Sequence, residues 1–393
     1  MKATTQPLDI YWDPFDTDID TDPYDLWRRM RDEAPVYYND RFDFYAYSQF
    51  ADVEAAHRDP SVYLSSHGTV LEIMSQSHVN SGSMIFRDPP EHTRLRSMVS
   101  RSFTPRRMAS LEDHIRTLCG ALLAPWRDGA TFDFVEDFGA PLPSMVICEL
   151  LGFPAADREW AKQRIDTSFH IEPGVGMIND ISLTAMIELH GYLTELLTAR
   201  AADPGDDLLS GLTQCELNID ECADFAVLLI SAGTETVARL LGWAAIVLDN
   251  HPDERAKLVN DPSLTSNAIE ELLRYEAPSP VQGRWTSRPV EIHGQVIPAD
   301  SKVLLLTGSA GRDNRKYAAP DRFDVERNFD HHVSFGFGIH FCLGAALARL
   351  EGKVAIEQAL VANPSWVVDR DRAVRLHTST VRGWSKVPVG TIR

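Results

Sequence analysis

The sequence predicts a mainly α-helical protein with a smaller β-rich portion, which is an α+β fold class. Apolar residues recur at helical spacing along most of the chain, and segments with strand-like alternation are few and short. The 23 Pro and 23 Gly residues are scattered and do not gather in a linker. Since no repeat or low-complexity tract divides the chain either, we expect residues 1–393 to form a single domain.

Helices are predicted where apolar residues return every three or four positions. In chain order they are Asp25 to Asp32, Glu91 to Phe103, Met108 to Trp126, Leu142 to Leu151, Ile181 to Arg200, Asp220 to Asp249, Leu264 to Tyr275 and Leu343 to Ala362. Strands are predicted where residues alternate or are β-branched: Val36 to Tyr47, Pro289 to Ile297, Lys302 to Leu306 and Val374 to Val389. The dipeptide His293-Gly294 predicts a hairpin turn inside the second of these.

Composition excludes several classes of protein. Lys plus Arg number 38 and Asp plus Glu 57, a formal net charge of −19, which disfavours nucleic acid and anionic lipid as partners. The contents of 44% hydrophobic and 24% charged residues exclude a disordered or fibrous chain. The acidic N-terminal segment has no apolar run, so we expect no membrane anchor and a cytoplasmic location. The five cysteines, an odd number without a C-x-x-C pair, exclude a disulfide framework or a zinc ribbon.

One cysteine has unusual surroundings. Cys342 lies in the run Phe335-Gly336-Phe337-Gly338-Ile339-His340-Phe341-Cys342-Leu343-Gly344, at the start of a predicted helix. An isolated cysteine is usually a small buried hydrophobe. Here the free N–H groups at a helix start stabilise a thiolate, the form that binds metals, and the glycines let the backbone approach a flat group. A single thiolate without a second Cys or His at chelating spacing suits an iron held by a macrocycle.

This run resembles the haem-binding signature of the cytochrome P-450 family, F-x-x-G-x-H-x-C-x-G, and the likeness extends over nearly the whole chain through four ordered motifs. The resemblance implies the P-450 fold, with haem b (iron protoporphyrin IX) between a long distal helix and the cysteine loop. It also implies that Cys342 is the proximal iron ligand and that Phe335, Gly336 and His340 contact the haem.

A polar segment interrupts the most apolar predicted helix. The sequence Ala232-Gly233-Thr234-Glu235-Thr236 inserts a glycine, which costs about 1 kcal/mol relative to alanine in a helix, and an acid that is expensive to bury unpaired. The helix could end at the glycine with the acid in solvent, but apolar periodicity continues to Leu248. The segment resembles the family's A-G-x-[DE]-T motif. The implied roles are room for haem and dioxygen at Ala232 and Gly233, and a catalytic proton relay at Glu235 and Thr236.

A further motif is a charge pair on one helix face. Glu271 and Arg274 lie three residues apart, an arrangement that is common by chance and stabilises an exposed helix by only about 0.2–0.5 kcal/mol. Their position between the distal helix and the cysteine loop, followed by Pro320-Asp321-Arg322-Phe323, matches the family's order. The resemblance implies that Glu271, Arg274 and Arg322 form a structural charge network behind the cysteine loop.

Basic residues that follow Asp88-Pro89-Pro90 have two interpretations. His92 and Arg96 lie four residues apart on one helix face, which could be a solvated basic face. The resemblance implies instead that they bind the two haem propionates together with Arg284 and His340.

The segment from His92 to Arg107 holds five arginines and no acids, in contrast to the net charge of −19. These could be ordinary surface arginines. In the family's fold this region flanks the cysteine face, where the resemblance implies that a small acidic ferredoxin docks, itself supplied by a ferredoxin reductase and NAD(P)H. The residues expected at the docking face are Arg101, Arg106 and Arg107.

The resemblance also implies which segments line a distal substrate pocket: His67 to Phe86, Ser168 to Ile181, Pro280 to Gln282 and the turn near Val381. The individual candidates are Leu229, Ala232, Val281 and Val381. This lining is mostly apolar and rich in Met, which suits a hydrophobic terpenoid, steroid, fatty acyl or aromatic molecule. His78, His170 and Arg382 could anchor a polar end, although we expect each at the surface.

The implied activity is that of a haem-thiolate monooxygenase, which uses dioxygen and two externally supplied electrons to hydroxylate or otherwise oxidise such a substrate. Three alternatives stay open. A peroxide-driven peroxygenase typically lacks the acid–alcohol pair, which is intact here. A haem sensor or electron carrier usually has a sixth protein ligand, and no His or Met lies between Ser231 and Ala238. The third is an α-helical binding protein without haem.

Overall fold

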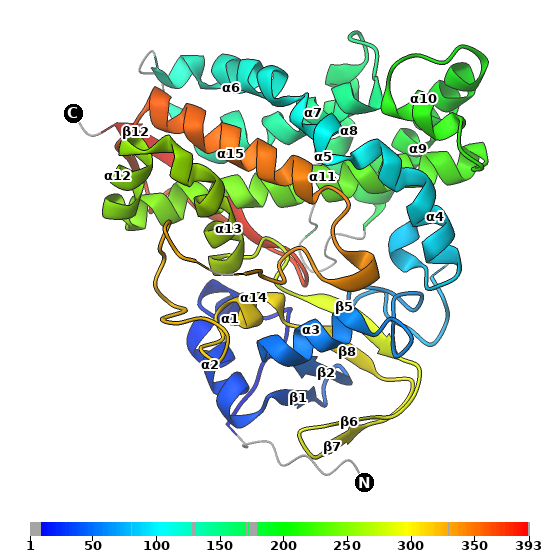
Figure 1. The fold of residues 1–393 in the computed structure, drawn as a ribbon, viewed down its shortest axis with the longest axis vertical. Helices are drawn as coiled ribbons and strands as arrows, with labels where there is room; N and C mark the ends of the chain where they lie inside the picture. The colour runs from blue at the N-terminus through cyan, green and yellow to red at the C-terminus, as the bar shows by residue number, and fades with distance from the viewer. Residues whose placement is uncertain are drawn as a thin grey trace.

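The computed structural model describes residues 9–79, 81–127, 131–169, 172, 179–328 and 330–391. A large helical body lies at one end and a smaller β-containing portion at the other, with the N-terminal segments in the latter (Figure 1). The predicted fold class is therefore confirmed.

The described helices before the longest one are α1 (Thr17–Thr21), α2 (Tyr24–Glu33), α3 (Phe50–Arg58), α4 (Glu91–Val99), α5 (Pro105–Ala109), α6 (Glu112–Arg127), α7 (Pro141–Leu151), α8 (Arg158–Ser168), α9 (Asp180–Ala202) and α10 (Leu208–Thr213). Five of them, namely α1, α3, α5, α8 and α10, were not predicted from the sequence. The predicted helix from Glu91 to Phe103 ends earlier as α-helix and continues as one 3-10 turn. The next helix starts at Pro105, because Thr104 caps it by accepting a hydrogen bond from the Arg107 N–H.

The C-terminal half carries the longest helix and the helix after the cysteine loop. Its helices are α11 (Ile219–Asn250), α12 (Pro252–Asn260), α13 (Thr265–Tyr275), α14 (Thr307–Gly311) and α15 (Ala345–Ala362). A single 3-10 turn, Gly338–His340, lies within the cysteine loop.

Within the described residues, the β structure consists of four small sheets. The largest has the strand order β1 (Val36–Asn39), β2 (Phe44–Tyr47), β8 (Lys302–Leu305), β5 (Gln282–Thr286) and β3 (Tyr63–Leu64). Only the β2–β8 pair among its ladders is parallel. The others are β4 (Phe132–Asp133) with β12 (Pro388–Thr391) and β9 (Trp366–Val368), the pair β10 (Val374–His377) and β11 (Arg382–Lys386), and the hairpin β6 (Val290–Ile292) and β7 (Gln295–Ile297). The predicted turn at His293-Gly294 is confirmed, since both residues have positive φ.

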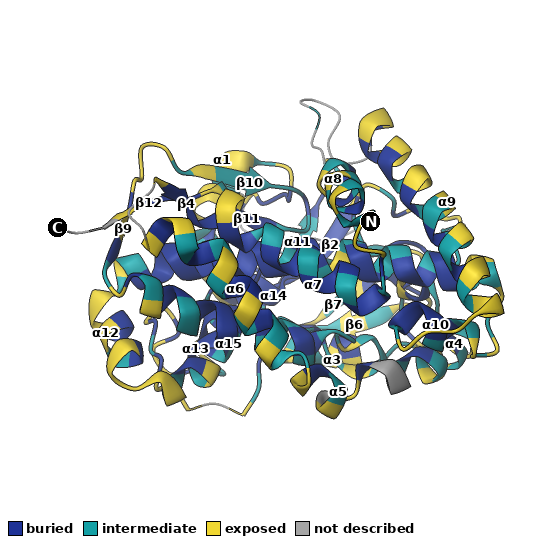
Figure 2. Cartoon of the chain, turned by 90° about the horizontal axis from the view of Figure 1, so that it is seen from above, coloured by how far each residue is buried: buried dark blue, intermediate teal, exposed yellow. Residues whose placement is uncertain are grey.

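Helix α11 runs through the centre of the helical body, where it packs against α7, α9, α15 and β11 (Figure 2). Asn218 begins it with a capping box to Glu221. The helix is long and apolar enough to cross a membrane, but 61% of its most apolar window is buried inside the protein, as in a core helix. It therefore positions Thr234 and Glu235 of the polar segment inside the molecule.

Candidate active site

The cysteine loop is shaped by two glycines with left-handed backbone. Gly336 and Gly338 have φ of 68° and 70°, and a Cβ on Gly338 would lie 2.4 Å from the carbonyl oxygen of His57. The Cys342 N–H donates to the Phe335 carbonyl at 2.9 Å and closes the loop three residues before α15. Burial raises the pKa of the Cys342 thiol, while the Gly344 N–H, Arg96 and Arg349 oppose that rise. The loop thus presents one thiol beside hydrogen-bond and charge partners for its thiolate form.

Four basic side chains from distant segments converge beside this loop. His92 of α4 and His340 of the loop have ring centroids 4.2 Å apart. Arg96, one turn beyond His92, donates to the Phe341 carbonyl at 2.7 Å. The buried Arg284 of β5 donates to the carbonyl of its own neighbour Gly283 at 2.7 Å. The structure brings together the four residues that the sequence singled out for one role.

The same cluster has donors in excess of acceptors. Both ring nitrogens of His92 are buried without a hydrogen-bond partner. Burial and the neighbouring Arg284, His92 and Arg96 lower the pKa of His340 to about 2, and burial lowers the pKa of Arg284 to about 10. The nearby carboxylate of Asp88 accepts from two backbone N–H groups, at 2.8 and 3.1 Å. Such a cluster is suited to anionic acceptor groups.

The polar segment of α11 does not break the helix, so the alternative of a helix end at Gly233 is excluded. Ala232 is exposed and Thr236, one turn later, is half-buried, although Thr234, Glu235 and Val237 around them are buried. The Thr236 hydroxyl donates to the Ala232 carbonyl at 2.9 Å. A methyl group on Gly233 would meet only Ile147, at 3.8 Å, so packing within the chain does not require glycine there.

The carboxylate of Glu235 is bound by an arginine that was not predicted from the sequence. Arg239 donates from Nε to Oε1 at 2.9 Å and from Nη2 to Oε2 at 3.1 Å, and both side chains are at most 10% exposed. Its Nη1 donates to the Trp384 carbonyl of β11. The signal was present in the sequence, because Glu and Arg four residues apart share a helix face.

Comparisons with known proteins agree with this arrangement. The family description "Cytochrome P450" matches residues 195–379. A putative cytochrome P450 123 from Mycobacterium tuberculosis is 36% identical over 397 residues, which cover 99% of each chain. The chain belongs to the cytochrome P450 family. A vitamin D(3) 25-hydroxylase from Pseudonocardia autotrophica is 40% identical over 357 residues, 87% of this P450 and 86% of the relative.

Solved structures show the same fold. The open form of cytochrome P450 EryK from S. erythraea superposes with a TM-score of 0.87 at 35% identity, covering 94% of this chain and 96% of that one. As a family member the protein is a P450 monooxygenase that binds haem b. The site fits that cofactor, because the donor cluster suits its two propionates. In the described part of the chain, no group of three or more His, Cys, Asp or Glu side chains is placed to hold a metal ion.

The predicted charge network needs one correction. Glu271 and Arg274 are fully buried and form two hydrogen bonds of 2.7 Å. The prediction that Arg322 is the third member is wrong: its side chain is 64% exposed and lies 3.7 Å from Asp324. Arg327 is the third member of the network, because it donates to Glu271 Oε1 at 3.0 Å. Arg322 contributes its backbone carbonyl, which accepts hydrogen bonds from Arg274 and Arg327. The direction of a side chain in this turn follows from tertiary packing.

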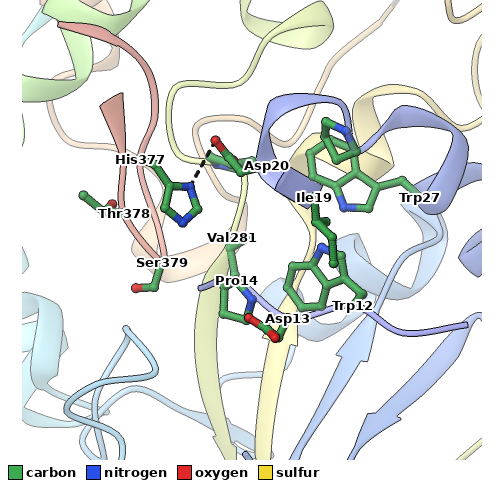
Figure 3. Close-up of a pocket in the computed structure, with 12 residues that line it drawn as sticks. Trp12, Asp13, Pro14, Ile19, Asp20, Trp27, Val281, His377, Thr378 and Ser379 are labelled. Carbon is green, nitrogen blue, oxygen red and sulfur yellow. Dashed lines mark ion pairs between the residues drawn. The ribbon is translucent and has the colours of Figure 1, made fainter. Parts of the chain in front are cut away.

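The candidate pocket residues lie in different surroundings. Leu229 of α11 is 9% exposed, and Val381 is half-buried in the turn between β10 and β11. Val281 lines a cavity of about 20 Å³, room for one water molecule, together with Trp12 and Trp27 of the β-rich portion (Figure 3). Ser379 of the same turn donates to Glu72 at 2.6 Å, which ties the turn to the loop from His67 to Phe86.

Two of the possible polar anchors can be located. His78 is exposed, as expected, with its ring against that of His67. The expectation that Arg382 lies at the surface is wrong, because it is 2% exposed and donates to Glu276 at 2.7 Å. His170 lies outside the described residues.

The basic segment presents fewer free charges than its composition suggests. Arg106 is exposed and Arg107 half-buried on α5, which packs against α15. Arg94 pairs with Glu91 at 2.7 Å and with Glu221 at 2.5 Å. The side chain of Arg101 lies outside the described residues. Among the side chains of this segment that the structure describes, Arg106 and Arg107 on α5 are therefore the ones available to a partner.

Proposed function

We propose that this P450 holds haem b with the Cys342 thiolate on the iron and oxidises a hydrophobic small molecule with dioxygen and two externally supplied electrons. The observation that carries the proposal is the position of a single thiol beside a cluster of donors in which the ring nitrogens of the buried His92 have no partner and the buried Arg284 donates to a backbone carbonyl. His92, Arg96, Arg284 and His340 bind the propionates in this proposal, and Phe335 and Gly336 form the wall below the ring.

Bound haem supplies the oxygen and electron-transfer chemistry, which the thiolate ligand tunes towards O–O cleavage. The residues of the chain position groups and move protons. Ala232 and Gly233 leave room on α11, and the Thr236 hydroxyl provides a proton donor on that face. In this proposal the carboxylate of Glu235, which Arg239 holds in place, relays protons to Thr236.

The substrate we propose is a terpenoid, steroid, fatty acyl or aromatic molecule. Leu71, Met74 and Met84 in the loop before α4 are buried and apolar, which supports such a ligand. Two relatives are named vitamin D(3) 25-hydroxylase and erythromycin C-12 hydroxylase, and these names favour the larger molecules among the proposed substrate classes. A screen for ligand-induced changes of the haem spin state would identify the class, and the residues to vary first are Leu229, Val281 and Val381.

We further infer that an acidic ferredoxin reduces this P450 in the cytoplasm. The exposed Arg106 and the half-buried Arg107 lie on α5, beside the helix that follows the cysteine loop. Their charge is opposite to the net charge of −19, so a negatively charged partner would be steered to this face.

The carbon-monoxide difference spectrum of the reduced protein tests the proposal. A thiolate ligand shifts the Soret band to the red, and Cys342→His should bind haem and lose that shift. A reduced wild-type protein without the shifted band would refute the assignment of Cys342. Turnover driven by hydrogen peroxide, at a rate equal to that with reductase and ferredoxin, would favour the peroxygenase alternative.

A further inference from the structure

A fifth basic side chain lies beside the four that converge at the cysteine loop. His57 is in the last turn of α3, a helix of the β-rich portion, and is 5% exposed. The imidazole is close to the loop: a Cβ on Gly336 would lie in van der Waals contact, 3.8 Å from His57 Cε1 and 3.7 Å from Gln282 Oε1. The imidazole, the first turn of the cysteine loop and the start of β5 therefore meet at one point.

Neither ring nitrogen of His57 has a hydrogen-bond partner, and both are buried. A buried imidazole without partners destabilises the folded chain, because its polar atoms have lost their hydrogen bonds to water. Burial and Arg284 lower the pKa of His57 to about 3, so the ring is neutral and has one N–H donor and one acceptor nitrogen. Arg284 has only donors and cannot satisfy the ring N–H. That N–H therefore needs an acceptor from elsewhere, and beside Arg284 an anion is favoured.

We propose that His57 is a further carboxylate-binding side chain of this site, which donates a ring N–H to a haem propionate together with Arg284 and His340. This inference rests on the proposed function. It places one propionate contact on α3, outside the segments of α4, β5 and the cysteine loop that the sequence singled out. His57 is a positioning residue, since it binds the periphery of the cofactor and not the reacting atoms.

The test compares His57→Leu with His57→Gln in the haem-loaded protein. Transfer of haem to excess apomyoglobin measures the rate of haem loss. A lost hydrogen bond to a charged group should make His57→Leu lose haem about tenfold faster, whereas His57→Gln keeps a donor and should stay within about threefold of wild type. Resonance Raman spectra should show a shifted propionate bending band in His57→Leu and a smaller shift in His57→Gln.

Failure of this inference differs from failure of the proposed function. If wild type gives the red-shifted carbon-monoxide band but His57→Leu loses haem at the wild-type rate with an unchanged propionate band, His57 is a packing residue and the inference is wrong. If wild type gives no shifted band, the Cys342 assignment fails, whatever the transfer rates. A matched control is His251→Leu: this half-buried imidazole bonds the Val247 carbonyl at the end of α11, and its loss should leave the propionate band unchanged.

Discussion

Arg239 binds both carboxylate oxygens of Glu235 from one helical turn further along α11, at 2.9 and 3.1 Å. The same guanidinium donates to the Trp384 carbonyl, so the acid of the proposed relay is tied to β11. The two hydrogen bonds hold the carboxylate of Glu235 in one orientation on α11.

Removing the arginine should destabilise the protein. Arg239→Met leaves the buried Glu235 without its cation, and we expect a loss of about 3 kcal/mol in the free energy of unfolding, measured by urea denaturation. Adding Glu235→Gln should recover part of this loss, because the unpaired charge is gone. Strictly additive effects of the two substitutions would show that the pair does not couple.

Loss of the Thr236 hydroxyl should uncouple electron use from product formation. With the ligand that gives the largest spin-state change as substrate, Thr236→Ala should raise the share of electrons released as hydrogen peroxide several-fold. Thr234→Ala is the matched control, since this buried hydroxyl donates to the Ile230 carbonyl at 2.8 Å. Equal coupling in Thr236→Ala and wild type would remove Thr236 from the relay.

Substitution of Arg327 should destabilise the protein much more than substitution of Arg322. Arg327→Leu removes a partner of the fully buried Glu271, and we expect about 2–4 kcal/mol of destabilisation together with a lower haem content after expression. Arg322→Leu changes an exposed side chain and should stay within about 0.5 kcal/mol of wild type. The reverse order of effects would restore Arg322 as the network's third member.

Glu351 on α15 should make stability depend on pH. Burial raises its pKa from 4.5 to about 8, so between these values the folded chain holds a proton that the unfolded chain has released. Stability therefore falls as the pH rises through this range, by up to about 1.4 kcal/mol per pH unit from this group. Glu351→Gln removes that contribution and should gain stability relative to wild type from about pH 5 to about pH 8. A difference in unfolding free energy that is independent of pH would contradict this prediction.

Charge reversal on α5 should slow reduction. Arg106→Glu replaces an exposed positive charge near the cysteine face and should reduce the rate of reduction by an acidic ferredoxin roughly threefold to tenfold at low salt, with unchanged substrate binding. Arg372→Glu is the control, because this side chain is 66% exposed in the turn between β9 and β10. Equal rates for wild type and Arg106→Glu would argue against docking at α5.

Features that depend on residues close together in the chain could be predicted from the sequence. The cysteine loop, the unbroken α11 and the pair Glu271 and Arg274 each depend on residues close together in the chain, so composition and spacing sufficed. Strand β5 was missed, because five residues that include a glycine and an arginine carry no strand pattern, although it positions Arg284.

Which arginine side chains point into the protein could not be predicted from local sequence patterns. Arg327 and Arg322 lie in one irregular segment, and only tertiary packing decides which of them reaches Glu271. The inward position of Arg382 depends on Glu276, more than 100 residues away, and on α2. That residues 1–393 form one domain remains a prediction.

The donor cluster has a consequence for how the protein matures. Its members come from α4, β5 and the cysteine loop, and burial disfavours the charged form of the two arginines, Arg96 and Arg284. Because a dicarboxylate cofactor offsets this cost only in the folded chain, haem binding adds directly to the free energy of folding. Haem supply during synthesis should therefore set the yield of intact protein, with chains made in haem-poor cells more open to proteolysis.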